Sequence, residues 1–211
     1  MFRRLTLLAV ILLAYGCGEF PKDSSATLKG VRNDTLYAGI SHNIYFRQDS
    51  AFVNHFAKKL NATVVWTYGD HHYLMGLLEN NALDLAIGGF TVDSPYEKEA
   101  ALSRPYRIKR FKAGHPQKVT VKDIKGTRLL VTNKMMAAYV RKEGGIPVLT
   151  ATLSDVLLPA IADEIELKEA GMYITDKELH KEEYVIAVKK GENAFLMEIE
   201  KFIHEQEAKN Q

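Results

Sequence analysis

The sequence predicts an α/β fold with a mostly parallel sheet, and three strand-like segments carry this prediction. They occupy residues 35–40, 63–68 and 83–87. The first ends at a polar turn, the second is rich in β-branched and aromatic residues, and the third is a continuous apolar run suited to a buried strand. Helical periodicity between them gives two βαβ units, which favour parallel pairing.

Amphipathic helices separate these strands. Residues 50–60 place four apolar side chains on one face: Val53, Phe56, Ala57 and Leu60. Residues 71–81 form the second predicted helix, which starts after Asp70 and turns its leucines inward. The pair His71-His72 is not expected to hold a metal ion, because neighbouring side chains on a helix diverge. We expect no metal and no other cofactor.

A change of composition after Tyr106 indicates a second lobe. Residues 107–112 are basic and partly extended, and Gly114-His115-Pro116 is expected to end this segment. The predicted elements that follow are a strand at 127–132, a helix at 133–142, a strand at 147–150, a helix at 154–165 capped by Ser154 or Asp155, a strand at 184–188 and a helix at 193–206. We therefore expect residues 34–108 and 109–181 to form two lobes, with 182–211 returning to the first.

The N-terminal residues are typical of a secretion signal. Arg3 and Arg4 precede an apolar run, and small residues then lead to Cys17. The order Ala-x-Gly-Cys resembles a bacterial lipobox, which predicts cleavage of residues 1–16 and lipidation of Cys17. The alternative is an ordinary secretion signal with an incidental cysteine. Residues 17–33 are expected to form a polar tether.

Composition excludes some classes of partner. The chain has 211 residues, of which 46% are hydrophobic and 26% charged, which suits one domain or two small lobes. Its formal charge of +2 falls to zero once Arg3 and Arg4 are cleaved off, and no basic stripe with interleaved aromatic residues remains. Nucleic acid is therefore not an expected partner. Cys17 is the only cysteine, so no intrachain disulfide is possible.

The residues after the third strand carry the main functional signal. Gly88-Gly89-Phe90-Thr91 places bare backbone and a hydroxyl at the end of a buried strand, where ligands bind in open α/β sheets. With its neighbours, this segment resembles the signature of the bacterial extracellular solute-binding proteins of family 3, the polar amino-acid-binding receptors of ABC importers. Seven residues match in order and spacing: Asp84, Gly88, Gly89, Thr91, Ser103, Pro105 and Tyr106.

Two positions depart from the family pattern. The family's arginine, which binds the ligand carboxylate, corresponds to Tyr96, and the phenylalanine of its Phe-Ser pair corresponds to Leu102. A tyrosine offers one donor and no charge, whereas an arginine holds a carboxylate by two parallel hydrogen bonds. Lys134 and Arg104 are candidate replacements. Otherwise, the change favours a ligand without a carboxylate, or one held against the ring of Tyr96.

Weaker similarity to the family extends over about residues 35–206. Residues 123–126 resemble its Asp-Leu-x-Gly phrase, and residues 184–191 resemble its return strand. The family's second lobe is longer, and residues 164–167 are the nearest match to one of its strands. The resemblance implies a two-lobed periplasmic-binding-protein-like fold, in which each lobe is a mostly parallel sheet flanked by helices.

Receptors of this type bind at the cleft between the lobes and close by a hinge motion. The expected ligand-binding residues follow strand ends or flank the signature: Ser41, His42, Asn43, Tyr45, Gly88, Gly89, Phe90, Thr91, Tyr96, Thr132, Asn133 and Lys134. Each has a structural alternative. The glycines also suit a tight strand exit, Phe90 and Tyr45 the core, and Tyr96 surface packing. Thr91, Thr132 and Asn133 also suit turns or helix caps.

The resemblance implies a lipid-anchored, extracytoplasmic monomer that captures a small polar solute, amino-acid-like or related, for an ABC permease. No nucleophile elbow and no His-Glu-x-x-His motif occurs, so no catalytic residues are expected. The alternative is a non-transporting lipoprotein that uses the same fold as a sensor or protein-interaction module. Tyr96 and the short second lobe favour that alternative.

Overall fold

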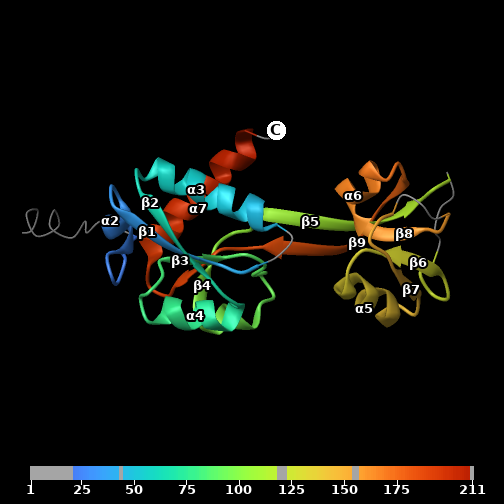
Figure 1. Cartoon of the computed structure of the whole chain (residues 1–211), viewed down its shortest axis with the longest axis horizontal. Coiled ribbons are helices and arrows are strands. Elements are labelled where there is room, and N and C mark those ends of the chain that lie inside the picture. The colour runs from blue at the N-terminus through green and yellow to red at the C-terminus, as the bar shows by residue number, and fades with distance from the viewer. Residues whose placement is uncertain (1–20, 43–44, 118–122, 154–156, 210–211) are drawn as a thin grey trace, which may run out of the picture. The chain divides into compact units, whose positions relative to one another are not determined.

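A computed structural model describes residues 21–42, 45–117, 123–153 and 157–209 (Figure 1). The predicted signal, Cys17 and Asn43 lie outside these residues. The chain divides into two compact units: Arg107–Glu183 forms unit 2, and the residues before and after it form unit 1. The chain therefore passes between the units twice, at Tyr106–Arg107 and at Glu183–Tyr184.

The described part of unit 1 contains a five-stranded sheet in the order β2-β1-β3-β10-β4. β1 (Thr35–Ile40) is parallel to β2 (Thr63–Tyr68) and β3 (Leu85–Ile87). β10 (Ala187–Lys189) is antiparallel to β3 and to β4 (Ala100–Leu102). The three strands predicted for the first half of this lobe are confirmed, and their carboxyl ends lie at one edge of the sheet.

Helices cover both faces of this sheet. α3 (Phe46–Lys59) and α7 (Asn193–Lys209) lie on one face, and α4 (His71–Glu79) lies on the other (Figure 1). The rings of Phe56 and Phe195, 5.9 Å apart, join α3 to α7 in the core. The three predicted helices are confirmed, but α3 begins at Phe46 rather than at residue 50.

The segment predicted as a tether up to residue 33 belongs to unit 1 from Asp23 on, so that part of the prediction is wrong. Asp23 accepts hydrogen bonds from the backbone N–H groups of Leu28 (2.8 Å) and Phe195 (2.9 Å). α2 (Thr27–Val31) buries Val31 in the core, with Leu28 packed beside it. The spacing of these two apolar residues gives α2 one face to bury.

Unit 2 has, within the residues described, a five-stranded sheet in the order β7-β6-β8-β5-β9. β6 (Arg128–Val131) is parallel to β7 (Ile146–Leu149) and to β8 (Ala160–Asp163). β5 (Arg107–His115) is antiparallel to β8, and β9 (Tyr173–Tyr184) forms an edge. β6 and β7 were predicted, whereas β8 and most of β9 were not.

Two helix–strand assignments in unit 2 are wrong. Residues 160–163, predicted as the end of a helix, form the buried strand β8, and residues 164–167, matched above to a family strand, lie in α6 (Glu164–Glu169). Periodicity cannot separate a strand from a helix in so short an apolar run. The predicted caps Ser154 and Asp155 lie outside the described residues.

The remaining boundaries in this half of the chain differ in detail. Gly114 and His115, expected to break the chain, continue β5, so that prediction is wrong. The helix predicted at 133–142 is confirmed as α5 (Lys134–Lys142). The predicted return strand at 184–188 overlaps β10 only at Ala187 and Val188, and Tyr184 belongs to β9.

Candidate functional site

The carboxyl ends of β2, β1 and β3 bring three loops together. The backbone N–H of Ser41 donates to the carbonyl of Ile87 at 3.0 Å, and the N–H of Gly69 donates to Ile40 at 3.4 Å. Nε2 of His71, the first residue of α4, lies 2.8 Å from the carbonyl oxygen of Gly88. We call this region the unit 1 edge site.

The Gly88–Gly89 turn lies at the centre of the unit 1 edge site. Gly88 and Gly89 have φ values of 105° and 92°, which residues with a side chain rarely adopt. Phe90 is fully buried, and its ring lies tilted against that of His71 with centroids 4.2 Å apart. The side chain of Phe90 therefore supports the turn from the core, as the structural alternative predicted, and has no exposed surface to offer a ligand.

Thr91 follows the turn and is half-buried. Its backbone bridges to Tyr184, and its carbonyl accepts a hydrogen bond from the N–H of Ser94 at 2.9 Å. The next backbone contact, from Val185 N–H to the carbonyl of Phe90 at 2.9 Å, fixes the same loop. The loop is thus held by its backbone, while Thr91 keeps a hydroxyl near the bare glycines.

Aromatic side chains surround the residues after β1. The ring of His42 lies 4.8 Å from Phe46, which stacks on Tyr68 at 5.9 Å. Tyr45, the residue before α3, meets Tyr184 edge to face at 5.8 Å. His42 and Tyr68 are exposed, so their ring faces are open to an apolar or cationic group.

Tyr96, at the family's arginine position, lies in a short 3-10 helix (Pro95–Lys98) and is half-buried. Its ring contacts Phe90 and His71 edge to face, with centroids 6.1 Å and 6.3 Å away. The candidate replacement Arg104 forms a surface ion pair with Glu207 of α7 at 3.2 Å. Tyr96 therefore lies with the edge-site residues, and Arg104 is held by α7.

Several residues of the matched signature have structural roles. The Asp84 carboxylate accepts a hydrogen bond from the N–H of Tyr37 at 2.8 Å. Both residues precede the strand ends that form the unit 1 edge site. Burial raises the pKa of Asp84, opposed by that hydrogen bond and aided by the charge of Glu192. Ser103 Oγ accepts from the N–H of Ile186 at 3.0 Å, which ties β4 to the residue before β10.

Unit 2 has an equivalent edge of its own. Thr132 follows β6, and its hydroxyl donates to Glu166 of α6 at 2.9 Å. Asn133 caps α5 by accepting from the N–H of Met136 at 2.8 Å, and Lys134 is exposed in the first turn of that helix. Because β6 and β8 are parallel, Asp163 lies at the same edge.

Comparison with solved structures identifies the fold. The L-cystine solute receptor of Neisseria gonorrhoeae, in its unliganded open conformation, matches with a TM-score of 0.65 and 16% identity, over 87% of this chain and 92% of that one. An ancestral cationic amino-acid solute-binding protein matches with a TM-score of 0.63 and 14% identity, over 87% and 94%. An ancestral arginine-binding protein bound to arginine matches with a TM-score of 0.51 and 20% identity, over 83% and 93%.

The chain has the fold of the family 3 solute-binding proteins. The resemblance noted in the sequence is thus confirmed at the level of fold, and so is an α/β fold class with two sheets flanked by helices. Both sheets are mixed rather than mostly parallel, because β10 in unit 1 and β5 in unit 2 pair antiparallel with their neighbours. No protein-family model matches the chain, and no curated relative matches it either. These three similar structures are described as binding proteins rather than as enzymes.

Sequence reasoning missed four charged or aromatic residues at the two edges of this solute-binding fold. Tyr68 ends β2 and His71 begins α4; the sequence pattern placed Tyr68 only in a strand, and it raised His71 only as a metal ligand that was not expected. In unit 2, Asp163 ends β8 and caps α6, and Glu166 lies 3.6 Å from the mostly buried Lys109. The misassigned β8 hid these two acidic residues.

Neither a cluster of metal ligands nor a membrane-spanning helix occurs among the described residues. These residues contain no group of three or more histidine, cysteine, aspartate or glutamate residues placed to hold a metal ion. Among the helices of the described part, none has both the length and the apolar character needed to cross a membrane.

Proposed function

We propose that this protein captures a small polar solute, amino-acid-like or related, outside the membrane and delivers it to an ABC permease. The observation that carries the proposal is the convergence of Ser41, His71 and the Gly88–Gly89 turn at the carboxyl ends of the parallel strands β1, β2 and β3. Such strand ends offer backbone donors to a ligand. The three similar structures with this fold are named for cystine, arginine and cationic amino acids.

The proposed ligand contacts divide into polar and aromatic groups. Thr91 and the N–H groups of Gly88 and Gly89 offer donors, while His42 and Tyr68 present exposed ring faces. A cationic or apolar group suits these rings. Tyr96 supplies a neutral hydroxyl where the family has an arginine, so a carboxylate on the ligand is not required.

Hinge closure and lipid anchoring complete the proposal. The two chain crossings would serve as the hinge, and the N–H of Tyr106 donates to the carbonyl of Tyr184 at 2.9 Å beside both crossings. Solute binding would favour a closed arrangement of the units that the permease recognises. Lipidated Cys17 would hold the protein at the outer surface of the membrane.

The test is a thermal-shift screen of the protein against amino acids, amines, small sugars and organic acids. A ligand at one hundred times its Kd adds about 2.7 kcal/mol to stability. We expect Thr91→Ala or Tyr96→Ala to reduce the shift to about half, because one lost contact weakens binding about tenfold. Thr63→Ala, an exposed position at the start of β2, is the matched control and should keep the full shift.

The second candidate is a non-transporting lipoprotein that senses or binds a partner with the same fold. It is favoured by Tyr96, which removes the charge of the family's carboxylate anchor. Absence of any thermal shift across the panel would support this candidate against solute capture. A shift caused by an amino acid and unchanged in Tyr96→Ala would instead show that the carboxylate anchor lies elsewhere.

A further inference from the structure

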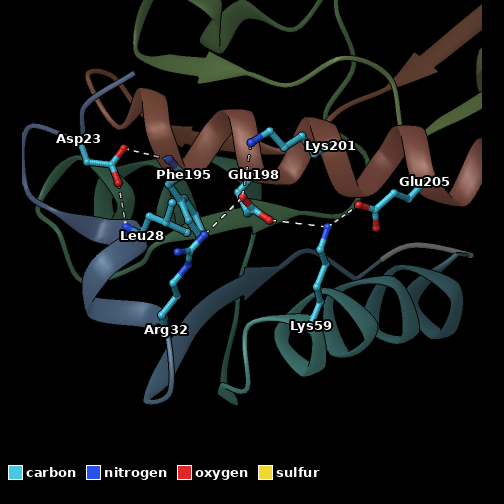
Figure 2. Close-up of polar contacts among 8 residues, drawn as sticks. All are labelled: Asp23, Leu28, Arg32, Lys59, Phe195, Glu198, Lys201 and Glu205. Carbon is cyan, nitrogen blue, oxygen red and sulfur yellow. Dashed lines mark hydrogen bonds and ion pairs between the residues drawn. The ribbon is translucent and has the colours of Figure 1, made fainter. Parts of the chain in front are cut away.

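A row of ion pairs runs along one side of α7 in unit 1 (Figure 2). Glu198 lies 3.5 Å from Arg32 after α2, 3.6 Å from Lys59 of α3 and 4.0 Å from Lys201 one turn along α7. Lys59 also reaches Glu205 at 2.7 Å. Three cations therefore share the carboxylate of Glu198, whose side chain is only 13% exposed. With Glu205 included, the row has three positive and two negative side chains.

A surface hollow lies at each end of this row. The first is lined by Pro21, Asp23, Lys22, Lys29 and Arg32, among other residues. The second is lined by His55, Lys58, Lys59, Glu205 and Lys209, among others. With the ion-pair row between them they form one strip, which we call the α7 basic strip. It contains seven lysine or arginine residues and three carboxylates.

The favourable position of a cation at the end of a helix explains some of these basic residues, but not why they line connected hollows. Lys29, Lys58, Lys59 and Lys209 each lie in the last turn of α2, α3 or α7, where a cation is favourable. That effect does not explain why the basic ends of three separate helices line two hollows that one row of ion pairs connects. α7 has 17 residues and is about 25 Å long, so the strip could meet several lipid headgroups at once.

The short stretch of chain between Cys17 and Pro21 limits how far the α7 basic strip can lie from a lipid on Cys17. Pro21, the first described residue, lines the first hollow and follows Cys17 by four residues. Four fully extended residues span at most about 14 Å. If Cys17 carries the lipid, as our proposed function holds, the strip begins within about 14 Å of the membrane surface.

We propose that the α7 basic strip docks on the anionic headgroups of the membrane that holds the lipid anchor. The lysines and arginines of the strip would meet lipid phosphates, while the lipid holds the chain close enough for weak contacts to act. Basic residues near an anionic surface contribute about 1 kcal/mol each, which is a factor of about five in the docking equilibrium. This inference rests on the proposed lipid anchoring and adds the orientation of unit 1.

The test uses the processed protein on vesicles of phosphatidylcholine, with or without phosphatidylglycerol. A membrane-impermeant amine reagent, read by mass spectrometry, reports how accessible each lysine is. We expect Lys29, Lys58 and Lys209 to be protected only on vesicles that contain phosphatidylglycerol. The exposed Lys125 and Lys142 of unit 2 should react equally on both vesicles. High salt should remove the protection, because screening shortens the Debye length from about 10 Å at 0.1 M to about 3 Å at 1 M.

The variant Lys29→Gln/Lys58→Gln removes two exposed charges of the strip and should weaken docking about 25-fold, read as lost protection of Lys209. Lys125→Gln/Lys142→Gln makes the same change of charge in unit 2 and should leave Lys209 protected. Equal reactivity of Lys209 on both kinds of vesicle would overturn the proposal.

Flotation with phosphatidylcholine alone separates the anchor from the docking. Failure to float there would contradict lipid anchoring, while flotation only with phosphatidylglycerol would still support the strip. Unchanged solute binding in the Lys29→Gln/Lys58→Gln variant would show that any loss of docking is separate from solute capture.

Discussion

Asp23 binds the start of α7, the helix that follows Glu192, and Glu192 binds the start of α2, the helix that follows Asp23. Asp23 accepts from the N–H of Phe195 in the first turn of α7, and Glu192 accepts from the N–H groups of Ser25 (2.8 Å) and Thr27 (3.3 Å) at the start of α2. The two residues also form an antiparallel bridge. The first described residues and the last helix are thus joined by reciprocal caps.

Removing either cap should destabilise unit 1. We expect Asp23→Ala and Glu192→Ala each to lower the free energy of unfolding by about 2 kcal/mol, because each leaves at least two backbone donors without their acceptor. Urea unfolding followed by the fluorescence of Trp66, the only tryptophan and a residue of β2, reports unit 1. The exposed Glu79→Ala should change stability by less than about 0.5 kcal/mol. Equal stability of all three variants would contradict the role of the caps.

The cap at Glu192 should weaken in acid. Burial alone would raise the pKa of Glu192, but hydrogen bonds from Ser24, Ser25 and Thr27 outweigh it and hold the pKa below its ordinary 4.5. The folded state therefore favours the carboxylate, which stabilises above pH 4.5 and is lost as the pH falls below it. The stability difference between the wild type and Glu192→Gln should shrink below pH 4.5. A difference that stays constant into acid would contradict this assignment.

Asp84 should show the opposite dependence. Because burial raises its pKa above the ordinary 3.8, the folded state keeps a proton that the unfolded chain has lost. Stability should therefore fall as the pH rises through the window just above 3.8. Asp84→Asn keeps an acceptor for the N–H of Tyr37 and should lack this fall. Parallel pH profiles for the wild type and Asp84→Asn, measured by urea unfolding, would be the contrary result.

His71 should affect solute binding although it was not predicted as a site residue. His71→Ala removes the contact with the Gly88 carbonyl and the ring contact with Phe90, which loosens the turn. We expect about a tenfold weaker affinity, measured by calorimetry, from the loss of roughly 1.4 kcal/mol. The exposed neighbour His72→Ala is the control and should bind as the wild type does. Equal effects of the two changes would refute a positioning role for His71.

Strong local patterns explain which elements the sequence could predict. β1 and β2 are bounded by turn residues, and α4 has its cap at Asp70, whose side chain accepts from the N–H of Tyr73. β9 has no such pattern, because charged residues interrupt it throughout (residues 173–184), and only pairing with β5 makes it a strand. β8 reads equally as part of a helix, and burial within the sheet decides its form.

The candidate site also combines residues that a local sequence pattern predicted with residues that no local pattern could predict. The rule that ligands bind beyond strand ends correctly placed Ser41 and the glycine turn at one edge, because β1 and β3 were both predicted. Whether these residues bind a solute stays a prediction. The support of that turn by His71 and Phe90 depends on a ring contact between α4 and the loop after β3, which no local spacing encodes.

Solute capture by the unit 1 edge site can be measured by calorimetric titration of the protein with arginine, L-cystine and other amino acids, alongside Thr91→Ala and the control Thr63→Ala. We predict that at least one solute binds saturably, with one ligand per chain, and that the affinity falls about tenfold in Thr91→Ala and is unchanged in Thr63→Ala. Absence of binding by every solute, or binding that Thr91→Ala leaves unchanged, would contradict solute capture by this site.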